Sequence, residues 1–469
     1  MQSIPLPLRT LAWVACVFAF CVIVFGAFVR LSNAGLSCPD WPTCYGHITW
    51  PVKPAAVTRA NDAFPNRPVE SSRDWREQSH RFLAGTLGVL VLAEALAAVF
   101  ATRRRLGLVI AAVILIGIGI PLYMAKDYVS SSVVAAIGEA LLLGVTIFWR
   151  GEGWRRIAVL ALAVVCFQAL LGMWTVTWLL LPAVVTAHLL GGLLTFALLA
   201  WLAWRLQQNR QNRGQSRVST GSFGLPSHDA KHDSDPGFDP GFGRGLRAVI
   251  IIGLVLLSCQ IFLGGWTSTN YAALACGIGK SAFPTCLGQW WPTMDFQHGF
   301  ILLRHIGVDY QGGILDAAAR TAIQMVHRMG AVVVFVYLLW LAHKVGRAGM
   351  RWHALALVLL LCAQVALGIG NVTLGLPLWI AVAHTGGAAL LLFALVALLA
   401  RTEFVRSSLI AASPEVPACA DVLESRTPER ALQPPSMAKR SVPDFPQQPL
   451  RSGSPSSSVP GPRSRVPVK

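Results

Sequence analysis

Ten long apolar runs, separated by shorter polar segments, dominate the chain. Each is close to the roughly 20 residues with which an α-helix crosses the hydrocarbon core of a bilayer. Backbone groups in lipid must bond within the chain, so the pattern predicts membrane-spanning helices and an all-α polytopic membrane protein. The runs are 11–29, 82–101, 107–125, 132–149, 157–179, 184–204, 248–267, 321–342, 354–374 and 378–400.

The halves of the chain repeat one another. QALLGMWTVTWLLLPAVVTAHLLGG at 168–192 parallels QVALGIGNVTLGLPLWIAVAHTGGA at 364–388 without a gap, at an offset of 196 residues. HRFLAG at 80–85 parallels HRMGAV at 327–332 at an offset of 247, so the first half holds 51 extra residues. The repeat predicts two pseudo-symmetric four-helix bundles, with two additional helices inserted at about 103–153.

Four regions follow from this division. We expect an N-terminal helical half at 1–204 and a C-terminal helical half at 248–400. The polar segment 205–247 and the Pro-, Ser- and Arg-rich segment 401–469 are predicted to be a disordered linker and tail. An even number of spans puts both ends of the helical part on one side, and the Arg-rich segments between the runs predict that this side is the cytoplasm.

Composition and charge agree with a membrane protein. The chain is 54% hydrophobic and 13% charged, which excludes an ordinary soluble domain. Its net charge of +17 comes from basic residues beside the apolar runs, so we read it as a positive-inside signal and expect no nucleic-acid partner. The first run is interpreted as an uncleaved signal anchor, and the location predicted is a bacterial inner membrane, multi-pass, with both termini cytoplasmic. Basic residues flanking the runs include Arg103, Arg104, Arg105, Arg155, Arg156, Lys344, Arg347, Arg401 and Arg406.

Two long outer loops, at about 30–80 and 268–320, each carry a pair of cysteines. The pairs are Cys38 with Cys44 and Cys276 with Cys286. A close pair in a loop that faces an oxidising compartment can form a disulfide. Two unpaired thiols, or a zinc site that draws further ligands from elsewhere, are the alternatives that the sequence leaves open.

Four histidines occupy matching places near one end of apolar runs: His80, His188, His327 and His384. Imidazole at membrane depth is costly and is usually kept for function. Imidazoles from two facing helices can ligate one haem iron from both sides, so we predict one pair of metal ligands from His80 and His188 and another from His327 and His384. For any one of them, a hydrogen-bonded polar residue without a ligand is the plain alternative.

The repeat differs at one chemically important position. Glu77 lies three residues before His80, whereas Gln324 lies three residues before His327. Residues three apart share a helix face, so a carboxylate is predicted beside the first pair alone. A solvated carboxylate at the end of a loop is the alternative.

Other charged residues lie close to the predicted spans. Arg81 and Arg328 each follow a histidine, and each could contact a haem propionate or reach to the lipid interface. Glu94 and Glu139 lie inside apolar runs and receive no role.

On these motifs the chain resembles the haem A synthase family. The resemblance rests on FVRLSNAGLSCPDWPTCYG, on the Glu-x-x-His-Arg segment at 77–81, on QALLGMWTV with the histidine that follows, and on their echo in the second half. It implies that the C8 methyl group of a substrate, haem O, is oxidised to a formyl group to give haem A for terminal oxidases. An electron donor is then required, and haem O synthase and oxidase assembly factors become candidate partners. An oligomer of identical chains is left open.

The resemblance also assigns residues. His80 and His188 would face the substrate haem, His327 and His384 would be the axial ligands of a permanent haem b, and Glu77 would be the catalytic carboxylate. Cys38 and Cys44 would match the family's outer-loop pair. The family's usual plan has eight spans, so the two helices in 103–153 are additional.

Two other functions compete with this interpretation. A diheme b-type electron-transfer cytochrome explains the four histidines equally well, but it does not explain Glu77 opposite Gln324 or the cysteine pair near the first site. A repeat-built transporter would need broken helices and charged residues at mid-membrane.

Overall fold

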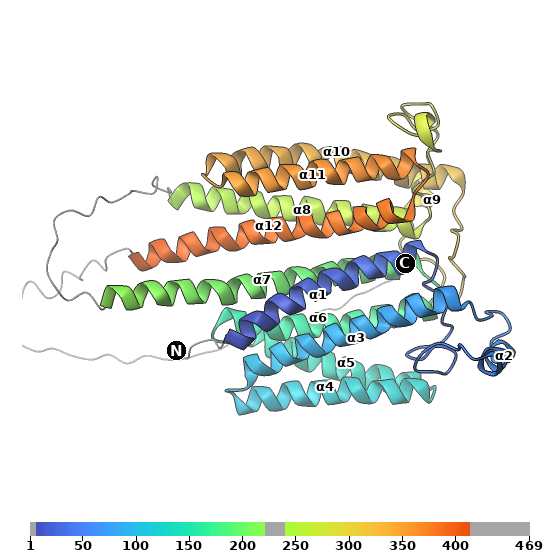
Figure 1. Ribbon diagram of the computed structural model, residues 1–469, viewed down its shortest axis with the longest axis horizontal. Coiled ribbons are helices and arrows are strands. Elements are labelled where there is room, and N and C mark those ends of the chain that lie inside the picture. Colours follow the sequence, from blue (N-terminus) through green and yellow to red (C-terminus); the bar gives the residue numbers. More distant parts are fainter. Residues whose placement is uncertain (1–5, 221–239, 413–469) are drawn as a thin grey trace, which may run out of the picture. The chain divides into compact units, whose positions relative to one another are not determined.

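The computed structural model describes residues 6–220 and 240–412, and this part of the chain is helical (Figure 1). Ten of its helices are long and apolar enough to cross a membrane, which confirms the predicted all-α polytopic class. The spans are α1 (Leu6–Leu31), α3 (Ser71–Val99), α4 (Arg103–Met124), α5 (Tyr128–Ile147), α6 (Gly153–Thr177), α7 (Pro182–Thr220), α8 (Pro240–Thr269), α10 (Ala317–Arg347), α11 (Arg351–Thr373) and α12 (Leu378–Ala412). Short helices α2 (Pro54–Ala63), η1 (Gly279–Ser281) and α9 (Phe296–Gly299) lie in the loops.

Several boundaries differ from those that hydropathy predicts. Helix α3 begins at Ser71, well before the apolar run at 82–101, because its first turns are polar but helical. Helix α7 continues to Thr220 and α8 begins at Pro240, so much of the expected linker 205–247 is helical. Helix α12 likewise extends to Ala412 into the expected tail. The remainder of both segments, 221–239 and 413–469, lies outside the described residues.

The helices form two rings of four. In the first, α1 packs on α3, α3 on α6, α6 on α7 and α7 on α1. In the second, α8 packs on α10, α10 on α11, α11 on α12 and α12 on α8. The predicted inserted pair, α4 and α5, forms a hairpin whose main support is the contact of α5 with α6, outside the first ring (Figure 1). Each ring places α3 opposite α7, or α10 opposite α12.

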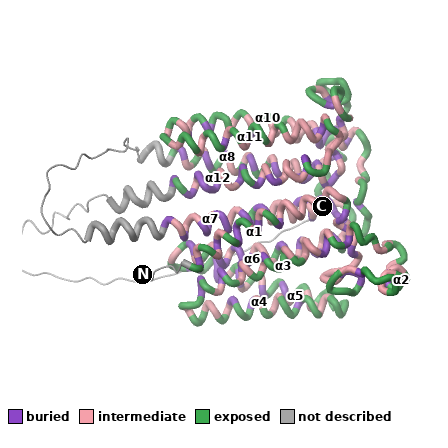
Figure 2. The backbone as a smooth tube through the Cα atoms, viewed as in Figure 1, coloured by how far each residue is buried: buried purple, intermediate pink, exposed green. Residues whose placement is uncertain are grey.

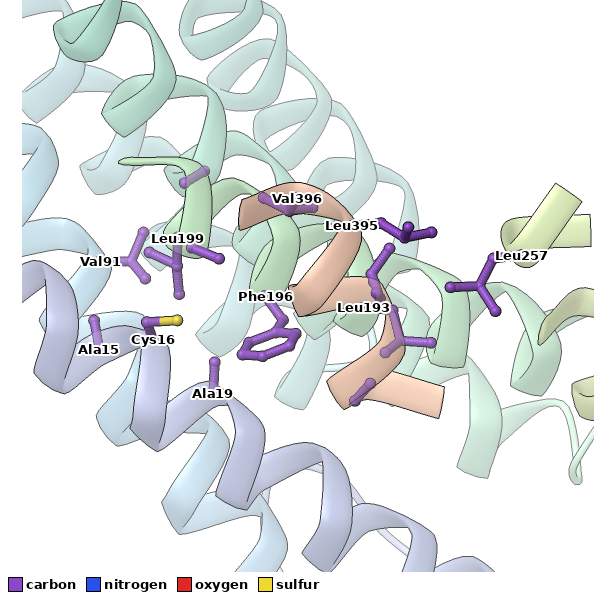
Figure 3. Packing of buried hydrophobic residues seen from close by; sticks show 14 of the residues in the cluster. Ala15, Cys16, Ala19, Val91, Leu193, Phe196, Leu199, Leu257, Leu395 and Val396 are labelled. Carbon is purple, nitrogen blue, oxygen red and sulfur yellow. The ribbon is translucent and has the colours of Figure 1, made fainter. Parts of the chain in front are cut away.

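The contacts between the rings obey the same pseudo-symmetry. Helix α7 packs on its counterpart α12, and the contact of α1 with α12 is matched by that of α8 with α7. Buried residues gather on these central helices, whereas many residues of α4, α5, α10 and α11 are exposed (Figure 2). At the centre Phe196 of α7 stacks on Phe393 of α12, with ring centroids 6.0 Å apart, among residues shown in Figure 3. Both rings therefore share one apolar core.

The repeat extends into the loops. Cys38 and Cys44 form one disulfide, with their Cα atoms 4.8 Å apart, and Cys276 and Cys286 form the other, at 4.5 Å. The second cysteine of each pair opens a β-bridge to the residue three positions later. These pairs are therefore neither free thiols nor thiolate ligands of zinc in this structure. We call the end of the helices that carries these loops the loop end.

In the first loop, a tyrosine is buried beside α2, and the second loop has a different residue at the matching position. Tyr45 packs against Phe64 behind α2, and its hydroxyl donates to the carbonyl oxygens of Ser37 at 2.9 Å and Pro68 at 3.1 Å. Burial, followed by the nearby carboxylates, raises the pKa of Tyr45, so the phenol remains a neutral donor. At the matching position of the second loop, Leu287 is 54% exposed.

Candidate functional site

The four predicted histidines lie at one depth near the loop end. His80 is in α3, His188 in α7, His327 in α10 and His384 in α12, each roughly 9–15 Å along the helix axis from the helix start. The helices that carry each pair stand opposite one another in their ring. The structure thus places the two histidines of each predicted pair on opposite helices of one ring.

Each imidazole rests on a glycine of the neighbouring helix. A Cβ atom built at Gly26 would lie 2.8 Å from Cε1 of His80, and the other three glycines would place it 3.1–3.2 Å from Cε1 of their histidine. Histidines and glycines therefore alternate around each ring. The absence of a side chain lets each histidine ring lie against the neighbouring backbone. The pairings are Gly26 with His80, Gly172 with His188, Gly264 with His327 and Gly368 with His384.

Glutamine side chains donate hydrogen bonds to the backbone of three of the four histidines. The Nε2 atoms of Gln168, Gln260 and Gln364 donate to the carbonyl oxygens of His188, His327 and His384 at 2.7, 2.9 and 2.9 Å. Gln260 also lies 3.0 Å from Nδ1 of His327, which fixes the orientation of that ring.

The glycines that follow two of the histidines make room for these amides. A side chain at Gly191 would collide with Gln168, and one at Gly387 would collide with Gln364. At the position of α1 that matches Gln260, the first half has Val22. His80 therefore lacks the glutamine that its counterpart has.

Most of the four histidine rings have a nitrogen that makes no hydrogen bond within the described residues. Nδ1 of His80, His188 and His384 is buried without a hydrogen-bond partner in the described part of the chain. All four side chains are only partly buried despite their apolar surroundings. Facing imidazoles on opposite helices, with glycine beside them, are the donor set and the cradle that a flat iron porphyrin with two axial ligands needs.

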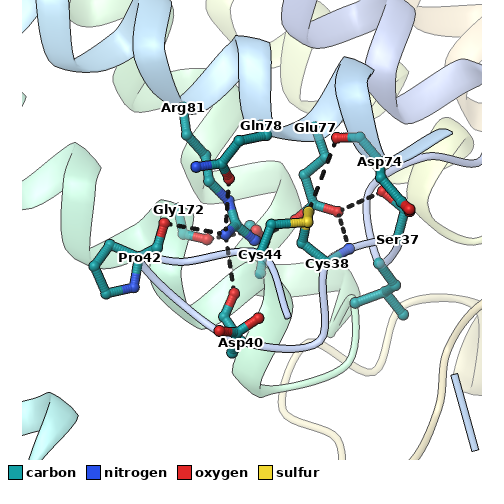
Figure 4. A network of polar contacts seen from close by, with 12 residues as sticks. Ser37, Cys38, Asp40, Pro42, Cys44, Asp74, Glu77, Gln78, Arg81 and Gly172 are labelled. Carbon is teal, nitrogen blue, oxygen red and sulfur yellow. Dashed lines mark hydrogen bonds and ion pairs between the residues drawn. A yellow bond between two sulfur atoms is a disulfide. The ribbon is translucent and has the colours of Figure 1, made fainter. Parts of the chain in front are cut away.

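Glu77 is buried, with 4% of its surface exposed, so it is not a solvated loop-end carboxylate. Its Oε2 accepts hydrogen bonds from Ser37 Oγ at 3.0 Å and from the backbone N–H of Cys38 at 2.9 Å (Figure 4). Its Oε1 pairs with Nη2 of Arg81 at 2.6 Å. These contacts fix the position of the Glu77 carboxyl group and attach α3 to the disulfide loop.

Arg81 also binds the loop through Nη1, which donates to the carbonyl oxygens of Asp40 at 2.9 Å and Thr43 at 2.6 Å. In the second half, Arg328 donates from Nη1 to Thr285 at 3.0 Å, and Thr285 matches Thr43 in the repeat. Nη2 of Arg328, however, is buried and has no hydrogen-bond partner among the described residues, and Gln324 occupies the position that matches Glu77. The two arginines share a loop contact, but they differ in the partner of Nη2.

Two further carboxylates, Asp74 and Glu94 of α3, are buried, and Glu139 of α5 is partly buried. Within the described residues, both oxygens of Asp74 and Glu94 and Oε2 of Glu139 lack hydrogen-bond partners. Asp74, one turn before Glu77, was not singled out by the sequence pattern, which attributed its segment to the loop. Thr321 and Leu341 occupy the positions that match Asp74 and Glu94, so the repeat does not preserve these two carboxylates in the second half.

Fold and site together define a class: a duplicated polytopic helical protein in which two histidines face each other across each bundle. The comparison with known families agrees with this class. The chain belongs to the cytochrome oxidase assembly protein family COX15-CtaA, whose model matches residues 9–121 and 124–396. The matched residues include both helices of the α4–α5 pair.

Relatives of known name span most of the chain. The Heme A synthase of Shewanella oneidensis is 34% identical over 381 residues, which cover 81% of this chain and 92% of the relative. The Heme A synthase of Sphingopyxis alaskensis is 25% identical, and the match covers 79% of this chain and 85% of the relative. That of Halalkalibacterium halodurans is 22% identical, and the match covers 77% of this chain and 86% of the relative.

Proposed function

We propose that this protein is a haem A synthase, which oxidises the C8 methyl group of haem O to a formyl group to give haem A for terminal oxidases. Membership of the family and the names of its relatives support this function. The observation on which the proposal depends is local. In an otherwise duplicated frame, one histidine pair has a buried glutamate, paired with Arg81, on the same helix as His80, and the other has Gln324 at that position.

The difference between the halves suggests a division of labour. Haem O, the substrate, would lie between His80 and His188, on the side that carries Glu77. A permanent haem b would lie between His327 and His384, where Gln260 fixes one ring and Gln324 replaces the carboxylate. When bound, the haem groups supply the electron-transfer and oxidative chemistry. The protein's part is to hold the methyl group and to shield it from water.

Glu77 would act through its charge. Its oxygens accept from three donors, which restrain the carboxyl group relative to the helix that carries His80. A fixed negative charge stabilises positive charge that develops nearby in a transition state. Arg81, the disulfide Cys38–Cys44 and Ser37 would keep that charge in place.

The arginines would differ in their contact with the substrate and the cofactor. Arg328 has a buried free Nη2 and is the better candidate for a haem b propionate. The Arg81 guanidinium already binds Glu77 and the loop, so a propionate would have to share it. The disulfide Cys276–Cys286 would stabilise the loop that carries Thr285.

Location and partners follow from the same proposal. The protein would be multi-pass in a bacterial inner membrane, with both termini cytoplasmic and the loop end outside, where an oxidising compartment favours its disulfides. Haem O and lipid are the first partners. An electron donor is required, and haem O synthase and oxidase assembly factors are candidates to deliver substrate and accept product.

A conversion assay separates this function from that of a diheme electron carrier. The purified protein is supplied with haem O and reductant in air, and the haem groups are extracted and identified by chromatography and mass. If the protein is a haem A synthase, the extract should contain haem A as well as haem B. A carrier would return haem B and unchanged haem O.

A substitution at the glycine beside His80 tests the proposed substrate site. Gly26→Ala is expected to lower haem A formation by roughly a hundredfold, because its Cβ would push on a ring 2.8 Å away and misplace a ligand. Gly85→Ala is the control, since a Cβ there meets nothing within 4 Å. Equal activity of the two variants would remove Gly26 from the site.

A further inference from the structure

Arg30, in the last turn of α1, reaches from the first half into the second. Its Nη2 donates to the carbonyl oxygen of Ser268 in α8 at 3.0 Å, and its Nη1 donates to the hydroxyl of Tyr271 at 3.4 Å. The guanidinium carbon lies 4.7 Å from the centroid of the Tyr271 ring. These contacts fix a positive charge between the halves, in a planar orientation.

The repeat locates that charge near the pseudo-twofold axis. Gly26 and Gly264, Arg30 and Ser268, and Cys38 and Cys276 all differ by 238 residues, so Arg30 contacts the residue equivalent to itself. In a twofold arrangement, equivalent residues meet only close to the axis. Arg30 is therefore about equally placed with respect to both halves.

Its depth also relates it to both histidine pairs. Arg30 lies one helical turn beyond Gly26 toward the loop end, and Ser268 lies one turn beyond Gly264. Those two glycines are the ones that pack on His80 and His327. The guanidinium thus lies about one turn from the level of a histidine of each pair.

Arg30 has a donor left over. Its Nε is buried and has no hydrogen-bond partner in the part of the chain that the structure describes. Burying such a donor is costly unless something accepts from it. Arg81, by contrast, spends its guanidinium on Glu77 and on loop carbonyls.

We infer that Arg30 is a binding residue shared by the two haem sites, which donates hydrogen bonds to propionate carboxylates of both porphyrins and raises the reduction potential of the resident haem. The inference rests on the proposed function for its ligands. A fixed cation favours the reduced iron electrostatically, and a planar guanidinium is suited to carboxylates.

The test is a redox titration of the resident haem in the purified full-length protein. With Arg30→Gln, the ratio of reduced to oxidised haem at a fixed potential should fall about tenfold, because a positive charge that favours the reduced iron is lost from the haem edge. Arg67→Gln is the matched control. Arg67 also joins the halves, through a 3.3 Å ion pair with Asp309, but that pair is exposed and its loss should leave the ratio unchanged.

Other outcomes decide against the inference. An unchanged ratio in Arg30→Gln, or an equal fall in Arg67→Gln, would overturn it while leaving the proposed function intact. A protein without any bound haem would instead refute the proposed sites. If the Arg30→Gln protein cannot be produced, Arg30→Lys is the second test. Lysine keeps the charge but loses the planar donors, so the ratio of reduced to oxidised haem should stay unchanged while haem dissociates faster. An unchanged rate of haem dissociation would count against a role for Arg30.

Discussion

Glu77→Gln should reduce haem A formation by at least about a hundredfold, while the content of haem B stays at the level of the parent protein. The amide can still accept from Ser37 and Cys38, but it carries no charge and cannot pair with Arg81. Loss of a positioned charged or proton-transferring group typically costs a factor of 10²–10⁴. The measurement is haem A produced per mole of bound haem B.

Two controls separate chemistry from structure in this prediction. Ser37→Ala removes one hydrogen bond to the same carboxylate without changing its charge, so activity should fall only severalfold. Gln324→Glu places a carboxylate at the matching position of the second half and should not create a second converting site. Normal haem A output from Glu77→Gln would exclude Glu77 from the mechanism.

Loss of either histidine of the second pair should nearly abolish binding of haem B. In His327→Ala one of the two proposed iron ligands would be lost. Among the described residues, the neighbouring amide of Gln260 lies behind the histidine ring and could not replace it. In His80→Ala the resident haem should remain, and haem A formation should stop. Pyridine haemochrome spectra measure the first effect and haem extraction the second.

A histidine outside both pairs supplies the control. His305 lies exposed in the second loop, so His305→Ala should change neither haem content nor activity. If His327→Ala retained all its haem B, the assignment of the second site would be wrong. If His80→Ala and His327→Ala gave the same loss of haem B, the two sites would not be distinct in the way we propose.

Much of this architecture could be predicted from the order of residues. Ten apolar runs became ten helices, and the gapless repeat around His188 and His384 predicted that they occupy equivalent helices. The cysteine pairs became disulfides. These features depend on local composition and on duplication, which a single sequence records.

Other features depended on tertiary contacts. Glu77 lies in a polar stretch that hydropathy assigns to a loop, and it is buried because the disulfide loop folds over the first turns of α3. The glycines beside the histidines could have been found from their matching offsets, since Gly172 and Gly368 differ by 196 like the histidines they contact. The contact of Arg30 could not have been predicted in this way, because its partner Ser268 is 238 residues away in the sequence.

The central claim is that paired imidazoles from opposite helices hold two iron porphyrins in one protein. Low-temperature electron paramagnetic resonance of the oxidised protein, purified after loading with haem O, tests it most directly. The account predicts low-spin bis-imidazole signals from two sites, one of which disappears in His188→Ala and the other in His384→Ala. A folded preparation that binds no haem, or that gives only high-spin iron, would contradict it.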